Sequence, residues 1–350
     1  MAPAARGPAA ALAGRGGDAM TAERDVANAC RACPSLCERA CPVSAVAREA
    51  TPWAKMLRAA EALAGGLAPA EAAWLDWCTH CHACTDVCPA SVPVADVLAL
   101  AAARASGPEA GQAAGVDLHA WRELGVLRGD AAVVLDVGGA SEVDAAALTA
   151  WLLARGAADI HVLPGFSLGE DLLASGRHQA FETLAAVIDG ALGEVRVVAV
   201  AGGDALRALT AMQAAGRLRR VYLTLLDAWL ARFGLPGAAD AVRLEPCRTR
   251  RPGVAGGPSQ ARPQGQTVAG SALWPPAAAC CGAALPLARA APEAADAAAR
   301  QVLAALVAQG ARAVHVEDMQ CAAHLRKSLL QQGLPLRLEH RAGLLARGGR

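Results

Sequence analysis

Residues 78–89 read Cys78-Thr-His-Cys81-His-Ala-Cys84-Thr-Asp-Val-Cys88-Pro89. The spacing C-x2-C-x2-C-x3-C-P is typical of cysteines that ligate a 4Fe-4S cluster. Three thiolates spaced by two residues let one loop wrap a cubane and reach three of its irons. The fourth cysteine lies beyond the loop and points away from that cluster. The stretch therefore predicts an iron–sulfur site with one ligand left over for a neighbouring cluster.

A second run lies upstream and reads Cys30-Arg-Ala-Cys33-Pro-Ser-Leu-Cys37-Glu-Arg-Ala-Cys41-Pro42. It has one residue more between its second and third cysteines, so its loop is looser. In two-cluster ferredoxins the last cysteine of each run ligates the other cluster, and the two runs therefore support each other. We predict two 4Fe-4S clusters, one held by Cys30, Cys33, Cys37 and Cys88, and the other by Cys78, Cys81, Cys84 and Cys41.

Zinc and disulfides are the competing interpretations of these cysteines. Structural zinc usually takes two separated C-x2–4-C knuckles and requires neither a third cysteine in the loop nor a Cys-Pro end. Disulfides need an oxidising compartment, but Met1–Met20 has no sustained apolar region and no adjacent arginine pair. We therefore expect a cytoplasmic protein. His80 and His82 are interpreted as exposed loop residues rather than ligands, because four cysteines are already present.

The composition excludes several classes of protein. The chain has 350 residues, of which 54% are hydrophobic, so wholesale disorder is ruled out. Lys and Arg number 33 against 32 Asp and Glu, and a net charge of +1 gives no reason to expect nucleic acid as a partner. No uncharged apolar window of 18 or more residues occurs, so no membrane span is expected.

From residue 130 the sequence pattern changes, from helical stretches to short β-branched runs that alternate with helices. This alternation favours an α/β layer with a largely parallel sheet. The fold class expected is α+β overall, with an all-α two-cluster ferredoxin-like domain followed by an α/β domain. The expected divisions are a flexible leader at 1–20, in which Met20 is an alternative start, the helical cluster domain at 21–125, and α/β units at 126–240 and 241–350.

The two α/β units look like copies of one another. Val133–Gly138 aligns with Val242–Cys247, and the stretch from Pro164 to Asp204 has the same length as that from Cys281 to Cys321. The second copy carries Cys247, Cys280, Cys281 and Cys321, and the first carries none. These cysteines sit at the ends of predicted strands and helices, where α/β sheets bind ligands. The alternative is that they are ordinary buried cysteines.

Several pieces together resemble one family over about residues 21–345. They are the two cysteine runs, Glu245-Pro-Cys247-Arg, Cys280-Cys-Gly-Ala-Ala-Leu-Pro286 and Asp318-Met-Gln-Cys321-Ala-Ala-His324. The chain resembles the iron–sulfur subunits with CCG domains that are related to heterodisulfide reductase. That group includes the iron–sulfur subunits of glycolate oxidase and of anaerobic glycerol-3-phosphate dehydrogenase, and the lactate-utilisation iron–sulfur protein. The chain departs from the family by lacking cysteines in its first CCG copy, and by His324 where some members have a cysteine.

The resemblance implies tandem CCG-type repeats and a third iron–sulfur cluster on Cys247, Cys280, Cys281 and Cys321. It also implies an electron-transfer subunit with a flavoprotein dehydrogenase or another redox subunit as partner. The alternatives are a catalytic subunit that reduces a disulfide or quinone, and a cluster-assembly scaffold or sensor. No G-x-G-x-x-G follows a strand, so no nucleotide or flavin is expected in this chain, and no catalytic residue stands out.

Overall fold

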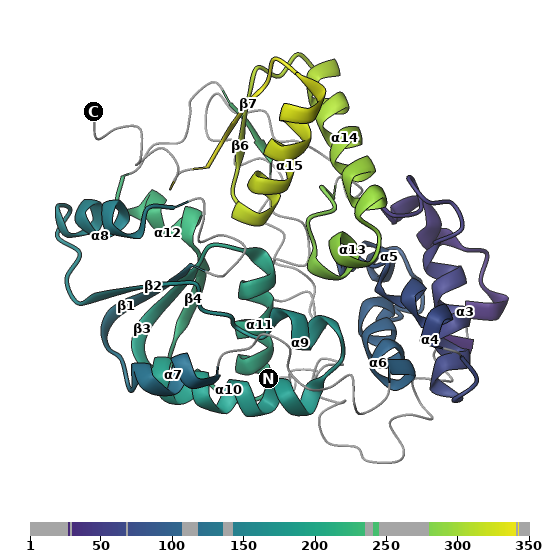
Figure 1. The fold of residues 1–350 in the computed structure, drawn as a ribbon, viewed down its shortest axis with the longest axis horizontal. Helices are drawn as coiled ribbons and strands as arrows, with labels where there is room; N and C mark the ends of the chain where they lie inside the picture. Colours follow the sequence, from purple (N-terminus) through teal and green to yellow (C-terminus); the bar gives the residue numbers. More distant parts are fainter. Residues whose placement is uncertain are drawn as a thin grey trace, which may run out of the picture.

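The computed structural model describes residues 27–28, 30–67, 69–106, 118–135, 143–234, 241–244, 280–340 and 342. The expected leader, Met20 and the segment 245–279 lie outside this part of the chain. The described protein mixes helices with two parallel sheets, consistent with the α+β class (Figure 1).

The segment with the two cysteine runs is helical. Its elements are η1 (Cys30–Ala32), η2 (Leu36–Ala40), α3 (Pro52–Leu63), α4 (Pro69–Ala72), η3 (Ala73–Asp76), α5 (Ala83–Asp86) and α6 (Val94–Ser106). Thr51-Pro52 predicts a capped helix start, and α3 begins there: the Thr51 hydroxyl accepts the Ala54 N–H at 3.1 Å, and Pro52 needs no backbone partner at the first position. Its apolar side packs against α6 through Met56, Leu63 and Leu98.

The first sheet has the strand order β2-β1-β3-β4, and all its pairs are parallel. Its strands are β1 (Arg128–Leu135), β2 (Ile160–Pro164), β3 (Glu194–Val200) and β4 (Tyr222–Leu225). The helices around it are α7 (Leu118–Leu124), α8 (Ala145–Leu153), α9 (Glu170–Ala174), α10 (His178–Leu192), α11 (Gly203–Ala214) and α12 (Leu226–Arg232).

Alternation along β1 explains how both faces of this sheet are covered. Ala132 and Val134 face the core formed with α10 and α11, whereas Val133 and Leu135 face α8 and α12. Helix α7 precedes the boundary expected at residue 125, yet it packs against α10, and Trp121 lies in the core of this layer. The sequence predicts a helix over 176–192, and α10 begins two residues later, at His178; the short helix α9 before it is not predicted.

The second sheet is smaller and has the order β5-β6-β7, again parallel. Its strands are β5 (Val242–Leu244), β6 (Ala313–Val316) and β7 (Arg337–Glu339), and its helices are α13 (Leu285–Ala290), α14 (Pro292–Ala308) and α15 (Met319–Gln332). Its core joins Val314 and Val316 to Leu303 of α14 and Leu325 of α15.

The two α/β units follow the same order of elements. The first runs α9, α10, β3, α11, β4, and the second runs α13, α14, β6, α15, β7. In both, the middle strand pairs in parallel with an earlier strand, β1 or β5, and with the following one, β4 or β7. The order of elements is therefore similar in these two parts of the chain.

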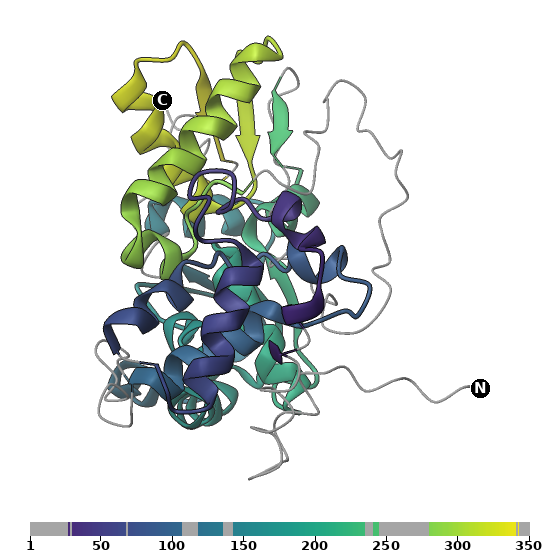
Figure 2. The same cartoon turned by 90° about the vertical axis from the view of Figure 1, so that its right-hand side faces the viewer.

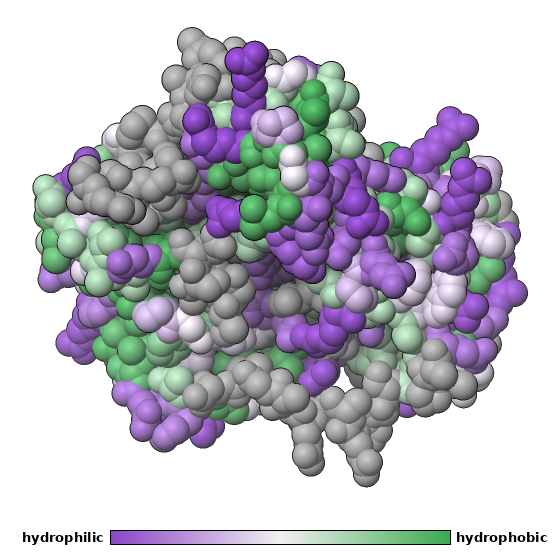
Figure 3. Space-filling view, turned by 45° about the horizontal axis from the view of Figure 1, so that its top comes forward, coloured by the Kyte–Doolittle hydropathy of each residue, from purple (hydrophilic) through white to green (hydrophobic). Residues whose placement is uncertain are grey.

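The helical segment packs beside both α/β units. Figures 1 and 2 show its helices next to α13 and α14, and one core cluster joins Val43 and Ala50 to Leu287 and Ala295. On the face in Figure 3, hydrophilic and apolar side chains are interspersed. None of the helices in the described ranges is both long enough and apolar enough to span a bilayer.

Candidate metal centres

The first cysteine run is shaped by two short 3-10 helices. Cys33 donates its N–H to the Cys30 carbonyl at 3.1 Å, and Glu38 donates to the Ser35 carbonyl at 3.0 Å. Ser35 has a left-handed backbone with φ of 59° and stands just before η2. This turn lies in the interval that is one residue longer than in the second run, so the extra residue is accommodated without separating Cys33 from Cys37.

Cys88 leaves the second run and joins the first. One hollow is lined by thiols and apolar side chains, among them Cys30, Cys33, Cys37, Cys84, Cys88, Leu36, Trp53, Met56 and Val92. Burial raises the pKa of Cys30, and the nearby thiols of Cys33 and Cys88 raise it further. The structure thus brings together the four cysteines predicted for the first cluster, and Cys84 also borders the hollow.

The remaining four cysteines form a second group. Burial raises the pKa of Cys81 to about 12, and Cys41 and Cys78 add to this rise against the effect of a Thr79 hydrogen bond. Burial also raises the pKa of Cys84, with Cys78, Cys81 and Cys41 contributing in that order. Cys41, from the first run, therefore lies near Cys78, Cys81 and Cys84, and it also affects the pKa of Cys37. Clustered thiols with raised pKa values release protons when they bind metal.

The two histidines in the second run are not the exposed loop residues that the sequence suggests. His80 is 2% exposed and both residues have left-handed backbones, with φ of 48° for His80 and 51° for His82. The His80 N–H donates to Cys78 Sγ at 3.3 Å, which is the kind of bond that tunes a ligating sulfur. Burial lowers the pKa of His80 well below its usual value, so its ring is neutral at pH 7.

Sequence reasoning missed Lys55, which is 2% exposed. Its Nζ donates to the carbonyl of Trp77, the residue directly before Cys78. No carboxylate pairs with Lys55 in the described ranges. A buried ammonium is costly unless an anion compensates it, and a cluster with four thiolates carries the required negative charge. The donor set and this buried cation therefore fit a 4Fe-4S cluster. The available signal was a lysine on the apolar stripe of α3, beside Met56 and one turn before Ala59.

The cysteines of the second α/β unit also converge. Cys280, Cys281 and Cys321 are all buried, and Cys281 Sγ lies 2.7 Å from Cys321 Sγ. Cys321 lies in the first turn of α15, where Asp318 accepts its N–H at 2.7 Å. The N-terminal end of a helix favours negative charge, such as that of ligating sulfur. Cys247 lies outside the described residues, as do Arg248, Arg250 and Arg251.

Gly282 allows the Cys280–Cys281 pair to approach α14 closely. Its φ is +82°, and a Cβ there would lie 2.6 Å from the Ala295 carbonyl oxygen. The ring of His324 hydrogen-bonds the same oxygen through Nε2 at 3.2 Å. His324 is therefore tied to the wall of this site through that nitrogen. No three His, Cys, Asp or Glu side chains in the described ranges are close enough to enclose a single metal ion.

The corresponding place in the first unit lacks thiols but touches the second unit. There α11 begins at Gly203, whose N–H donates to the Asp318 carboxylate, and the Met319 N–H donates to the Ala201 carbonyl at 3.3 Å. One buried carboxylate therefore accepts from the first turns of both α11 and α15. This contact holds the cysteine-free unit against the edge of the cysteine site.

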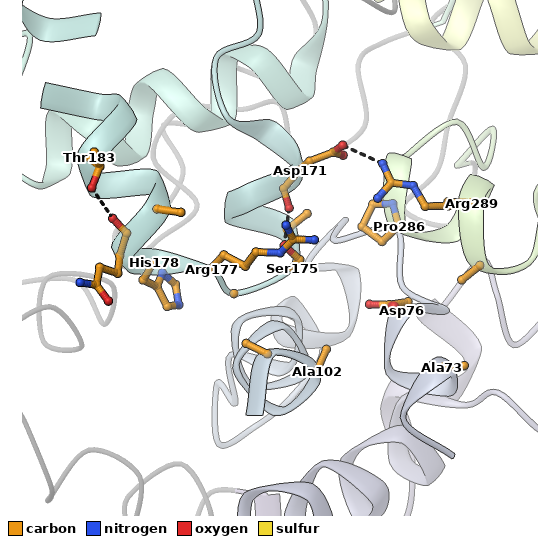
Figure 4. A pocket seen from close by; sticks show the side chains of 16 residues that line it. Ala73, Asp76, Ala102, Asp171, Ser175, Arg177, His178, Thr183, Pro286 and Arg289 are labelled. Atoms are coloured by element: carbon orange, nitrogen blue, oxygen red, sulfur yellow. Dashed lines mark hydrogen bonds and ion pairs between the residues drawn. The ribbon is translucent and has the colours of Figure 1, made fainter. Parts of the chain in front are cut away.

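A separate pocket of about 860 Å³ lies where the cluster segment meets both α/β units (Figure 4). Asp171 of α9 pairs with Arg289 of α13 at 2.7 Å across it. Burial raises the pKa of Asp76, while Arg289 and Arg177 act in the opposite direction. The lining therefore contains two arginines and two aspartates. Because these charges balance, the charge of the pocket favours no class of ligand.

Comparison with known proteins identifies the first of these regions. A family model described as a 4Fe-4S dicluster domain matches residues 26–92. No curated protein and no solved structure matches the chain. Residues 26–92, which contain both cysteine runs, are therefore similar to domains that bind 4Fe-4S clusters and serve in iron–sulfur electron transfer.

Proposed function

We propose that this protein is the iron–sulfur electron-transfer subunit of an oxidoreductase. It carries two 4Fe-4S clusters at residues 26–92 and a third cluster at Cys247, Cys280, Cys281 and Cys321. The clusters supply one-electron redox chemistry at potentials set by ligation, hydrogen bonds and exposure. The observation that supports this most is the dicluster match over the two cysteine runs.

The third site is supported by contacts in the second α/β unit. Two buried thiols whose sulfurs lie 2.7 Å apart are held at the beginning of α15 and beside Gly282. Leu244, the last residue of β5, shares a core with both of them, and Cys247 follows three residues later in the sequence. The convergence of these cysteines with the end of β5 is what favours a shared site over isolated core cysteines. They are the same cysteines that the resemblance to CCG-domain proteins implies.

The packing around the third site suggests which of the two clusters of residues 26–92 exchanges electrons with it. The loop after Cys41 packs through Val43, Ala47 and Ala50 against Leu287 and Ala295, close to Gly282. The group that contains Cys41 and Cys78 is therefore the one next to the second α/β unit. We propose a flavoprotein dehydrogenase as the redox partner and the cytoplasm as the location.

Metal analysis of single variants tests the third site. Cys281→Ser and Cys321→Ser should each lose about four irons per chain and keep the two clusters of residues 26–92. Ser328→Ala is the matched control, because Ser328 is also buried on α15 but faces Gln332 rather than the cysteines. Unchanged iron in both cysteine variants would contradict a third cluster.

Turnover of the isolated subunit separates a relay from a catalytic subunit. We expect the dithionite-reduced protein to pass electrons to a flavoprotein or a dye acceptor, but to reduce neither a disulfide nor a quinone catalytically. Sustained disulfide or quinone reduction that disappears in Cys281→Ser would contradict the relay and favour the catalytic alternative.

A further inference from the structure

The positive charges around the two cysteine groups of residues 26–92 are unequal. Lys55 is 2% exposed and lies on α3 with its ammonium bonded to the carbonyl of Trp77, one residue from Cys78. Buried charges are screened much less by water and salt than exposed ones, so they act more strongly on neighbouring groups. Lys55 therefore acts mainly on the cluster that Cys78 ligates.

Arg207 adds a second positive charge from another part of the fold. Arg207 belongs to α11, and this helix lies on the side of the first sheet towards the cluster segment (Figure 1). Burial raises the pKa of Cys78, while Lys55 and Arg207 both act to lower it. Arg207 also contributes to lowering the pKa of His80 and of His82. Arg207 is only half-buried, so solvent screens its charge more than that of Lys55, and its effect on the second group is the smaller of the two.

The first group has no comparable buried cation among the described residues. The pKa of Cys37 is raised to about 11 by burial and then by the thiols of Cys33, Cys30 and Cys41. Arg31 and Arg39 belong to the same run, but both are exposed, and Arg31 bonds to Asn28 at 3.1 Å. Exposed charges are screened by solvent and contribute little.

We propose that Lys55 and Arg207 make the cluster ligated by Cys41, Cys78, Cys81 and Cys84 the higher-potential one of the two. Reduction adds one negative charge to a cluster, and a nearby buried cation stabilises that charge. Electrons then rest on the cluster next to the α/β units rather than on the outer one. The inference rests on the proposed function, since it presupposes that both clusters are present.

The experiment is a redox titration of the anaerobically purified protein, monitored by EPR, for wild type and four variants. Lys55→Met and Arg207→Met remove the two cations, and Lys55→Arg keeps the charge. Arg58→Met is the matched control, because Arg58 is a cation on the same helix that stacks 5.1 Å above the Trp74 ring.

We expect Lys55→Met to lower the higher of the two cluster potentials of residues 26–92. The equilibrium constant for its reduction should fall about tenfold, which corresponds to 59 mV for one electron. Arg207→Met should shift the same potential by less, and Lys55→Arg and Arg58→Met should leave both unchanged. Retained clusters with an unmoved higher potential in Lys55→Met, or a shift of the lower potential instead, would overturn the inference alone.

Other outcomes separate this inference from the proposed function. If Lys55→Met does not fold, an unmoved higher potential in Arg207→Met overturns the inference. If the wild-type protein binds no 4Fe-4S clusters, the proposed function fails and the inference fails with it.

Discussion

Replacing Gly282 with alanine tests whether a close backbone approach builds the third site. Gly282 has φ of +82°, and the added Cβ would lie 2.6 Å from the oxygen and 2.9 Å from the Cα of Ala295. A left-handed alanine costs about 1 kcal/mol. Displacing the backbone of α14 adds about 2 kcal/mol, as overpacking does elsewhere. We therefore expect Gly282→Ala to destabilise the protein by about 3 kcal/mol.

Gly310→Ala is the matched control. Gly310 has a similar φ of +78°, but nothing lies within 4 Å of the position of its Cβ, so only the conformational cost of about 1 kcal/mol remains. Thermal unfolding monitored by circular dichroism should show a Tm lower by roughly 6–12 °C for Gly282→Ala and roughly 2–4 °C for Gly310→Ala. Gly282→Ala should also lose the iron of the third site. Equal Tm changes, with iron retained, would refute the reasoning.

Three further predictions concern capping, acid sensitivity and iron removal. Asp318→Ala should lower the free energy of unfolding by about 3 kcal/mol, because the buried Asp318 carboxylate accepts N–H groups from the starts of two helices. Asp144→Ala, at an exposed helix cap, should lower it by about 1 kcal/mol, and urea unfolding measures both. Burial lowers the pKa of His178, against the effect of Asp96 and Glu182, so the stability contributed by its neutral ring is complete above pH 6.5 and is lost as the pH falls. The Tm of His178→Gln should therefore drop less between pH 7.5 and 5.5 than the Tm of the wild type. Removing iron with a chelator should speed amide hydrogen exchange in residues 30–106, because cysteines pack against the core of this segment, and should leave β1 and β3 protected. Equally faster exchange in all of these parts would contradict the prediction.

Local signals in the sequence predicted most of the regular elements. Thr51-Pro52 sets the start of α3, and Gly65, with φ of +79°, follows its end. The β-branched runs predict six strands, at 131–137, 159–163, 195–200, 219–223, 241–245 and 313–317, and β1 to β6 lie within a few residues of these ranges. Several short elements were not predicted, including α12, α13 and β7. A few residues show too little hydrophobic periodicity for a prediction, and tertiary contacts decide their structure.

The site was predictable where ligand spacing is local and was missed where it depends on packing. The spacing of the two runs was enough to predict two clusters, and a 4Fe-4S dicluster model matches there. The burial of His80 and the effect of Arg207 on the pKa of Cys78 depend on how parts of the chain that are distant in sequence pack together. Neither can be inferred from neighbours in the sequence. The assignment of individual cysteines to clusters, and the third site, remain predictions.

Iron and acid-labile sulfide per chain, measured after strictly anaerobic purification together with EPR of the oxidised and reduced protein, test the central claim most directly. The account predicts about 12 irons and as much sulfide, with EPR signals of reducible 4Fe-4S clusters. About eight irons would contradict the third cluster and leave the two clusters of residues 26–92. Zinc without sulfide would contradict the electron-transfer function altogether.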